Sequence, residues 1–196
     1  MKDSPIKFVV VLASVCFCSA ALLSFVYAKT QPVLEKQQRE QESAAMKEVL
    51  PAAKAFDYNK NCSCWIGKSA DGEVVGYCFK AAEKGYSSVI EMMVGIDTNF
   101  KITGIKILSQ NETPGLGTRI VEVKADETLW DVLGGKKEKS DKPAVPWFLK
   151  QFYGKSLEDM DSVQTISGAT ISSSAVIRAV KRELKNMRSC VRKGSK

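Results

Sequence analysis

Histidine is absent from this chain of 196 residues, and its absence excludes several kinds of active site. Without an imidazole there is no Ser-His-Asp or Cys-His nucleophile pair, no HExxH zinc site and no CxxCH haem attachment. General acid–base catalysis by histidine is excluded as well. Any chemistry near neutral pH must therefore come from cysteine, lysine, carboxylates or a bound cofactor.

Most of the chain also lacks an excess of charge, although its formal net charge is +7. Residues 178–196 hold eight Lys or Arg residues and one acid, Glu183, so this tail carries the whole excess. A balanced body argues against a nucleic-acid-binding protein. We interpret the tail as a solvated helix face whose cations complement the negative end of the helix, with docking to lipid or to a partner as the alternative.

Cysteine is scarce in the body of the chain, where only Cys62, Cys64, Cys78 and Cys190 occur. Cys62 and Cys64 are too close in sequence for an easy mutual bridge, but either could pair with Cys78 across adjacent strands. A zinc site needs four ligands and the chain has no C-x2-C pair, so we expect no metal site. The pattern favours unbridged thiols or one structural disulfide.

One long hydrophobic run lies at the amino terminus. Residues 8–28 form a stretch of 21 residues without a charge. As a helix it would measure about 31 Å, which matches a bilayer core of about 30 Å. A cleaved signal peptide is the alternative, with a cleavage site after Ala28, but the run exceeds the usual apolar core of about 7–15 residues. We therefore expect an uncleaved transmembrane helix at residues 8–28.

The orientation of this helix follows only weakly from its flanking charges, because Lys residues precede it and Lys and Arg residues follow it. A lone N-terminal anchor normally exports the chain that follows. We therefore expect a single-pass protein of the cell (inner) membrane. Residues 1–7 would be cytoplasmic and the C-terminal domain extracytoplasmic.

The rest of the chain predicts an α+β fold, in which an antiparallel sheet with flanking helices stands behind the one transmembrane helix. A juxtamembrane helix is expected at residues 29–50, where Pro51 ends it, and a domain at 51–196. Turn signals at 69–72 and 97–100 predict two hairpins. The predicted strands are 64–68, 73–80, 88–96 and 102–108, and the predicted helices are 126–133, 146–152 and 172–187. The helical spacing of the last helix predicts one apolar stripe, which consists of Val176, Val180, Leu184 and Met187.

Small and hydroxylated residues crowd the junction before the last helix, at residues 167–170 with the sequence Ser-Gly-Ala-Thr. Gly168 permits backbone conformations that other residues resist. The first N–H groups of the following helix and its positive dipole end attract phosphate. A hydroxyl at this junction could contact a phosphate or be esterified by it. An ordinary Ser/Thr cap cluster is the alternative.

A second segment, residues 112–117, reads Glu-Thr-Pro-Gly-Leu-Gly. Its Pro-Gly pair suits the centre of a type II turn, and Gly117 adds another permissive position. The chain has no GxGxxG fingerprint and no P-loop lysine motif, so nucleotide binding by those routes is unsupported. We interpret the segment as a backbone-lined loop that lets a flat ligand approach closely, with a plain turn after a strand as the alternative.

Taken in order, these segments resemble the FMN-binding subunits of Rnf-type and Nqr-type electron-transport complexes. The resemblance covers nearly the whole chain, and the compact length is more similar to the G subunit of Rnf than to the longer C subunit of Nqr. The motifs that carry it are, in chain order, Gly85-Tyr86, residues 94–97, residues 112–117, Trp147-Phe148, residues 151–155 and residues 167–170.

The resemblance implies that FMN is bound covalently to Thr170 by a phosphoester, which a flavin transferase installs from FAD. The flavin would relay electrons in a membrane complex that couples ferredoxin and NAD to ion movement, beside other membrane and peripheral subunits. The chain would complete no reaction alone, and no catalytic residue is implied. The implied cofactor-binding residues are Thr170, Ser167, Gly168, Ala169, Glu112, Thr113, Gly115, Leu116 and Gly117.

One position departs from the family's pattern. Gln164 stands six residues before Thr170, where the family usually has an acid. The departure leaves room for a membrane-anchored binding or sensory module that holds FMN reversibly or not at all. Two more hypotheses stay open, namely the C subunit of an Nqr-type complex and a structural exported subunit stabilised by a disulfide.

Overall fold

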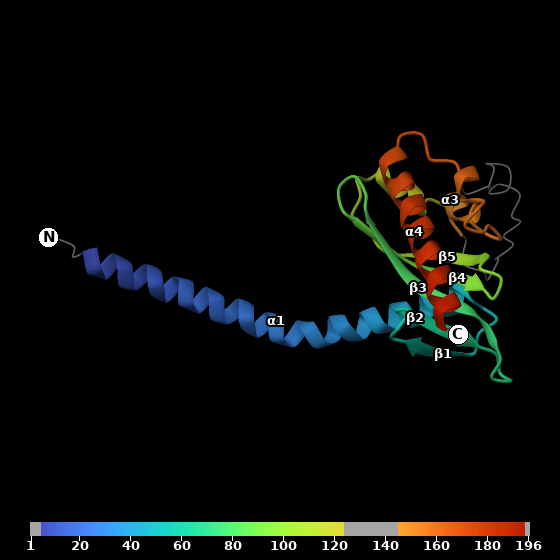
Figure 1. Ribbon diagram of the computed structural model, residues 1–196. Coiled ribbons are helices and arrows are strands. Elements are labelled where there is room, and N and C mark those ends of the chain that lie inside the picture. The colour runs from blue at the N-terminus through green and yellow to red at the C-terminus, as the bar shows by residue number, and fades with distance from the viewer. Residues whose placement is uncertain (1–4, 124–144, 195–196) are drawn as a thin grey trace, which may run out of the picture. The chain divides into compact units, whose positions relative to one another are not determined.

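The computed structural model describes residues 5–123 and 145–194 of the chain. The chain divides into two compact units, Met1–Gln41 and Glu42–Lys196 (Figure 1). Helix α1 (Pro5–Val49) makes up the described part of the first unit, and its last turns belong to the second. The helix predicted at residues 126–133 lies outside the described residues.

Helix α1 contains the predicted transmembrane segment and is long and apolar enough to cross a bilayer. Its most apolar stretch of 18 residues has a mean hydropathy of 2.6, and none of this stretch is buried inside the protein. The side chains of residues 6–28 are all exposed. Such a surface suits the hydrocarbon of a bilayer, which is as apolar as the side chains themselves.

Five strands form one antiparallel sheet, in which each strand pairs with the next along the chain. The two predicted hairpins are confirmed, with turns at 69–72 and 97–100. The first strand was not expected from the sequence, because it is short and most of its side chains are exposed at the sheet edge. The strands are β1 (Ala55–Asn59), β2 (Cys64–Lys68), β3 (Val74–Lys84), β4 (Val89–Asp97) and β5 (Ile102–Ser109).

One face of the sheet carries the main hydrophobic core, which helix α4 (Thr170–Gly194) covers (Figure 1). Helix α3 (Trp147–Lys150) and the 3-10 turn η2 (Met160–Ser162) pack into the same core. The α+β fold predicted from the sequence is thereby confirmed. The apolar stripe predicted for the last helix is buried against the sheet and consists of Val176, Val180, Leu184 and Met187.

The end of α1 packs on the opposite face of the sheet. Successive residues of a strand point to opposite faces, so Phe79 lies in the main core while its neighbour Cys78 lies in a second, smaller cluster. Burial of this apolar surface joins the last turns of α1 to the sheet. The second cluster consists of Ala45, Met46, Val49, Leu50, Ala53, Cys78 and Met93.

Glycines make room for this helix end. Gly95 and Gly104 are paired across β4 and β5. A Cβ atom at Gly95 would lie 2.5 Å from the carbonyl oxygen of Val49, and one at Gly104 would lie 2.9 Å from the Val49 Cα atom. Because both neighbours are backbone atoms, they cannot rotate away as a side chain can. A second glycine pair, on β2 and β3, gives similar room to Leu50.

Polar contacts also tie the last turns of α1 to the sheet. Lys80 Nζ lies 2.6 Å from Glu42 Oε1. The hydroxyl of Thr103 donates a hydrogen bond of 2.6 Å to the carbonyl oxygen of Val49, one of the acceptors that a helix leaves unpaired at its end. The compact unit therefore begins at Glu42, whereas the sequence predicts a domain that begins at residue 51.

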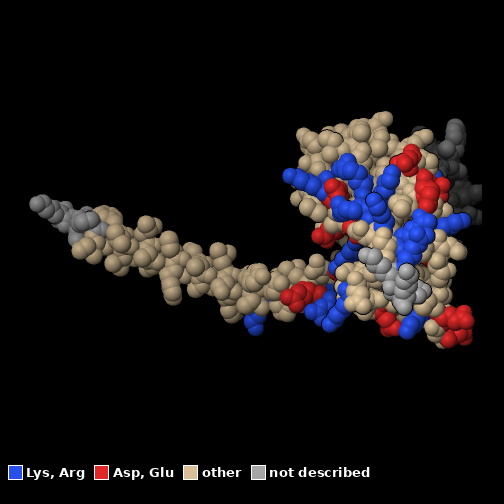
Figure 2. Space-filling view, viewed as in Figure 1, with Lys and Arg blue, Asp and Glu red and all other residues tan. Residues whose placement is uncertain are grey.

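Basic residues gather on the face of this unit where α4 lies, with acidic residues among them (Figure 2). Arg182 forms an ion pair with Glu83 of β3, and Lys181 Nζ lies 2.7 Å from Asp161 Oδ1. Exposed pairs of this kind contribute about 0–1 kcal/mol each. These pairs favour the interpretation of the basic tail as a solvated helix face.

One disulfide bond joins Cys62, just before β2, to Cys190 near the end of α4. One structural disulfide was among the favoured alternatives, but the structure does not show the pairing with Cys78 that the sequence left open. Cys64 and Cys78 lie on adjacent strands, but Cys64 is buried in the main core and Cys78 in the cluster on the opposite face. Side chains on opposite faces of a sheet point apart, so these two thiols cannot bridge.

Burial keeps these two cysteines in the thiol form. It raises the pKa of Cys64, and burial together with the nearby Cys64 raises the pKa of Cys78 to about 12. A thiol with a raised pKa is a poor nucleophile and metal ligand. Both residues therefore act as small apolar side chains of the two cores.

Substitution of Thr103 tests whether the end of α1 belongs to the folded domain. We expect Thr103→Val to lower the free energy of unfolding by about 1–3 kcal/mol, because the Val49 carbonyl loses its donor while the side-chain shape is kept. Thr103→Ser keeps the hydroxyl and should lower it by less. Urea unfolding of the chain in detergent, followed by tryptophan fluorescence, measures both. A Thr103→Val variant as stable as the wild type would contradict this docking.

Reduction of the disulfide should destabilise the domain. The bond closes a loop across a sequence separation of 128, for which chain entropy predicts about 5 kcal/mol. We expect dithiothreitol to lower the unfolding midpoint of the wild type. The matched control is the Cys62→Ser/Cys190→Ser double variant, which should unfold at a lower midpoint that the reductant does not change. Equal midpoints of the wild type with and without reductant would argue against the bond.

Candidate functional site

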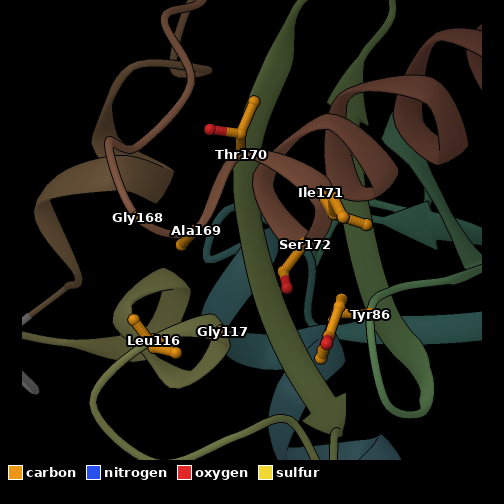
Figure 3. Close-up of a pocket in the computed structure, with 8 residues that line it drawn as sticks. All are labelled: Tyr86, Leu116, Gly117, Gly168, Ala169, Thr170, Ile171 and Ser172. Carbon is orange, nitrogen blue, oxygen red and sulfur yellow. The ribbon is translucent and has the colours of Figure 1, made fainter.

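A cavity of about 280 Å³ opens at the start of α4 (Figure 3). Three segments far apart in the sequence form its walls: the turn between β3 and β4, the loop before the 3-10 helix η1 (Gly117–Val121), and residues 168–172. The two segments singled out from the sequence therefore meet in space. The lining residues are Tyr86, Leu116, Gly117, Gly168, Ala169, Thr170, Ile171 and Ser172.

A tight turn leads the chain into α4. The N–H of Ala169 donates to the carbonyl oxygen of Ile166 at 2.9 Å, and Gly168 has a φ angle of +81°, which side chains disfavour. The N–H of Ser173 then donates to the carbonyl oxygen of Ala169 at 2.9 Å. The N–H groups of residues 170–172 precede this bond, so they form the positive end of a helix of 25 residues.

Thr170 is the first residue of α4 and its side chain is exposed. Its hydroxyl oxygen lies 3.5 Å from the carbonyl oxygen of Ile166, a distance at the limit of a hydrogen bond. In Figure 3 this hydroxyl and that of Ser172 point in different directions, and Ser172 points toward the Gly117 loop. The Thr170 hydroxyl is therefore open to a reagent from solvent, at a place that favours negative charge.

The loop at residues 112–117 forms the predicted type II turn. The N–H of Leu116 donates to the carbonyl oxygen of Thr113 at 3.2 Å, and Gly115 has a φ angle of +74°, as the third position of this turn requires. The hydroxyl of Thr118 accepts a hydrogen bond of 3.0 Å from the N–H of Gly115. The turn leaves the side chain of Leu116 half exposed at the rim of the cavity.

Glu112 is buried behind the cavity, with 4% of its surface exposed. One carboxylate oxygen, Oε2, accepts hydrogen bonds from the Ser172 hydroxyl at 2.6 Å and from the N–H of Tyr86 at 3.1 Å. The other, Oε1, accepts from the N–H groups of Ser87 and Ser88 at 3.1 and 2.9 Å. One side chain thus joins the turn between β3 and β4, its own loop, and the first turn of α4.

Hydrogen bonds keep this carboxylate charged. Burial alone would raise the pKa of Glu112, but the Ser172 hydroxyl and the N–H groups of Ser88, Tyr86 and Ser87 outweigh it, so the pKa lies below its ordinary value. None of the ion pairs found among the described residues includes Glu112. Within the described part of the chain, neutral donors therefore stabilise its charge.

The structure brings five of the nine predicted site residues to the cavity: Leu116, Gly117, Gly168, Ala169 and Thr170. The other four, Glu112, Thr113, Gly115 and Ser167, do not line it.

Glu112 is buried behind the walls, and the other three are close neighbours of lining residues in the chain. The carbonyl oxygen of Ser167 accepts a hydrogen bond of 2.6 Å from Arg119 Nη1. Tyr86, Ile171 and Ser172 also line the cavity but were not among the predicted site residues. Two signals in the sequence could have indicated them. Tyr86 belongs to a motif that carries the family resemblance, and Ile171 and Ser172 directly follow Thr170.

Comparison with known proteins gives this geometry its context. Residues 85–185 match the FMN-binding domain family, so the fold is that of an FMN-binding domain. The G subunit of an ion-translocating oxidoreductase complex from Methanosarcina acetivorans is 33% identical over 92% of this chain and 94% of its own. The chain therefore belongs to the family of G subunits of ion-translocating oxidoreductase complexes, as its motifs implied.

Two further proteins show the range of the similarity. The G subunit of the Na⁺-translocating ferredoxin:NAD⁺ oxidoreductase complex of Acetobacterium woodii is 34% identical, over 87% of this chain and 84% of its own. The crystal structure of NqrC from Shewanella oneidensis superposes with a TM-score of 0.43 at 18% identity, over 71% of this chain and 73% of that one. With α1 as the candidate span among the described residues, the chain is a single-pass subunit of a membrane complex.

The stability of the domain should depend on the ionisation of Glu112. A carboxyl whose folded-state pKa is lowered stabilises the fold above its unfolded pKa of about 4.3, and this stabilisation is lost as the pH falls through the folded pKa. We expect the difference in melting temperature between the wild type and Glu112→Gln to be largest near neutral pH and to shrink on acidification.

Melting curves followed by circular dichroism between about pH 7 and pH 3 measure this difference. The control is Glu91→Gln, which removes the same charge from an exposed residue of β4. That variant should follow the wild type at every pH. A constant difference between Glu112→Gln and the wild type across this range would refute the role of ionisation.

Proposed function

We propose that the chain carries FMN covalently, through a phosphoester between the flavin phosphate and Oγ1 of Thr170. The observation that carries the proposal is the place of this hydroxyl, which is exposed, lines the cavity and belongs to the first residue of α4. A phosphodiester keeps one negative charge, which the helix end stabilises by about 0.3–1 kcal/mol. Covalent linkage would also prevent loss of the cofactor.

The cavity suits the ring system of a flavin. Leu116, Ile171 and the ring of Tyr86 offer apolar surface, and Gly117 and Gly168 let a flat ring approach the backbone. Its volume of about 280 Å³ is close to the lower end of ligand pockets, about 300–1,000 Å³. The cavity would hold the ring, and the ribityl phosphate would extend to Thr170. When bound, FMN supplies one-electron and two-electron transfer.

Attachment would require a partner enzyme, a flavin transferase that uses FAD. The oxygen of Thr170 would form a bond to the phosphorus of the FMN half of FAD, the pyrophosphate bond would break, and AMP and the hydroxyl proton would leave. The exposed position of Thr170 supports access by such an enzyme. The other implied site residues, Ser167, Ala169 and Thr113 among them, would shape the backbone around the bound cofactor.

The flavin would act as an electron relay in an Rnf-type complex that couples ferredoxin and NAD to ion movement. Relatives of this chain include a subunit of a Na⁺-translocating and one of a proton-translocating ferredoxin:NAD⁺ oxidoreductase complex. The other subunits of the complex would deliver and accept the electrons. The chain alone would complete no reaction.

The disulfide supports the proposed orientation in the membrane. Such bonds form and persist in oxidising compartments and are rare in the cytosol. The bond between Cys62 and Cys190 lies in the same compact unit as the cavity. We therefore place this unit on the extracytoplasmic side of the membrane and the amino terminus in the cytoplasm.

Reversible binding of FMN is the second candidate, and Gln164 is the residue that favours it. Its backbone N–H donates to Gln151 Oε1 at 3.0 Å, and Gln151 Nε2 donates to its carbonyl oxygen at 3.3 Å. The Gln164 side chain is exposed. Hydrogen bonds of the backbone therefore hold the loop whichever side chain stands at position 164. The absence of the family's usual acid at this position would alter the attachment reaction and not the fold.

Flavin fluorescence of the denatured protein distinguishes the two candidates. In cells that possess a flavin transferase, we expect a fluorescent wild-type band on a denaturing gel and a dark Thr170→Val band, because valine keeps the shape but not the hydroxyl. Ser167→Ala, which removes the neighbouring exposed hydroxyl, should stay fluorescent. A dark wild-type band with flavin in the supernatant would favour reversible binding, and a fluorescent Thr170→Val band would rule out this linkage.

A further inference from the structure

We propose that Glu112 is the positioning residue of the flavin site, and that its buried charge lowers the reduction potential of the flavin. The proposal rests on the proposed function, since it concerns the same cavity. It differs from the expectation that Glu112 contacts the cofactor, because Glu112 does not line the cavity. The carboxylate acts instead through the three walls that it joins.

Each wall of the cavity is attached to this carboxylate. Tyr86 is held through its backbone N–H and Ser172 through its hydroxyl, both on Oε2. Gly117 belongs to the loop that Glu112 itself begins. All three of these residues line the cavity. A shift of the carboxylate would therefore move every wall at once.

The packing around Glu112 requires glycine at two neighbouring positions. A Cβ atom at Gly117 would lie 2.5 Å from Oε2, and one at Gly85 would lie 2.6 Å from Oε1. These two glycines therefore let the turn between β3 and β4 and the loop at residues 112–117 come close to the carboxylate. Because Gly117 also lines the cavity, only its backbone separates the charge from a bound ring on that side.

The hydrogen bonds require a carboxylate and exclude its amide. Oε1 receives the N–H groups of Ser87 and Ser88, and Oε2 receives the N–H of Tyr86. A glutamine has one oxygen and one NH₂ group, so whichever way it turns, its NH₂ group faces a backbone N–H. Two donors in contact leave a buried polar group without a partner, which is unfavourable.

The charge itself should affect electron transfer to the flavin. Adding an electron near a fixed negative charge is unfavourable, and the effect is stronger where water is excluded. The described residues place no cation in an ion pair with Glu112 that would cancel its field. Reduction of the flavin should therefore occur at a lower potential in the wild type than in a variant without this charge.

Two substitutions separate positioning from charge. Glu112→Asp keeps the charge but is shorter by one methylene, so it cannot reach both Ser172 and the turn at Tyr86. Glu112→Gln keeps the length but removes the charge. The matched control is Glu91→Gln, which removes the same charge from an exposed residue of β4 and leaves the Glu112 carboxylate and its donors in place.

The full chain is co-expressed with a flavin transferase, and two quantities are measured. The first is covalent flavin per folded chain, from gel fluorescence and near-ultraviolet circular dichroism. The second is the midpoint potential, from a redox titration of flavin absorbance. We expect both Glu112 variants to lose flavin several-fold, and the flavin that remains in Glu112→Gln to titrate at a higher potential. Glu112→Asp should titrate close to the wild type, and Glu91→Gln should match the wild type in both measurements.

If Glu112→Asp carries as much covalent flavin as the wild type, the positioning role is wrong. This variant tests that role even if Glu112→Gln does not accumulate. A wild-type potential in Glu112→Gln would overturn the effect of charge. If Glu112→Gln yields too little protein for titration, Glu112→Asp at a raised potential would overturn it as well. A wild-type chain without covalent flavin would instead contradict the proposed function, so the two failures are distinguishable.

Discussion

The hydrogen bonds to one buried carboxylate are the constraint on which the cavity depends. A charge removed from water is stable only where donors replace the water, and the donors to Glu112 come from a turn at residues 86–88 and from Ser172. These segments are brought together because each satisfies part of the same charge. The cavity is the space that remains between them, which explains why its walls come from parts of the chain so far apart.

The sheet supports this arrangement from both faces. On one face α4 buries its apolar stripe, which fixes the direction of the helix and the place of its first residue, Thr170. On the other face the last turns of α1 lie against glycines such as Gly95, where a side chain would collide with the backbone of Val49. The end of the membrane-anchored helix is thereby part of the domain that would carry the cofactor, and not a flexible linker to it.

Local rules account for the features that the sequence predicted well. Turn residues at 69–72 and 97–100 predicted two hairpins, the Pro-Gly pair at 114–115 predicted a type II turn, and helical spacing predicted the buried stripe of α4. Strand β1 escaped notice because it is short, so that its alternation of apolar and polar residues extends only from Phe56 to Asn59. The sequence left the cysteine pairing open because the pairing depends on which face of the sheet each thiol occupies, and strand adjacency alone does not settle that.

By itself the sequence determined an apolar helix of membrane length, an α+β domain, two hairpin turns, one type II turn and, through its ordered motifs, the family. Each of these depends on residues that are neighbours in the chain or repeat at a fixed period. Only the tertiary structure decided that Glu112 lies behind the cavity and that Tyr86 lines it, and only it paired Cys62 with Cys190. These facts depend on contacts between distant segments, which packing and the hydrogen-bonding needs of buried groups select.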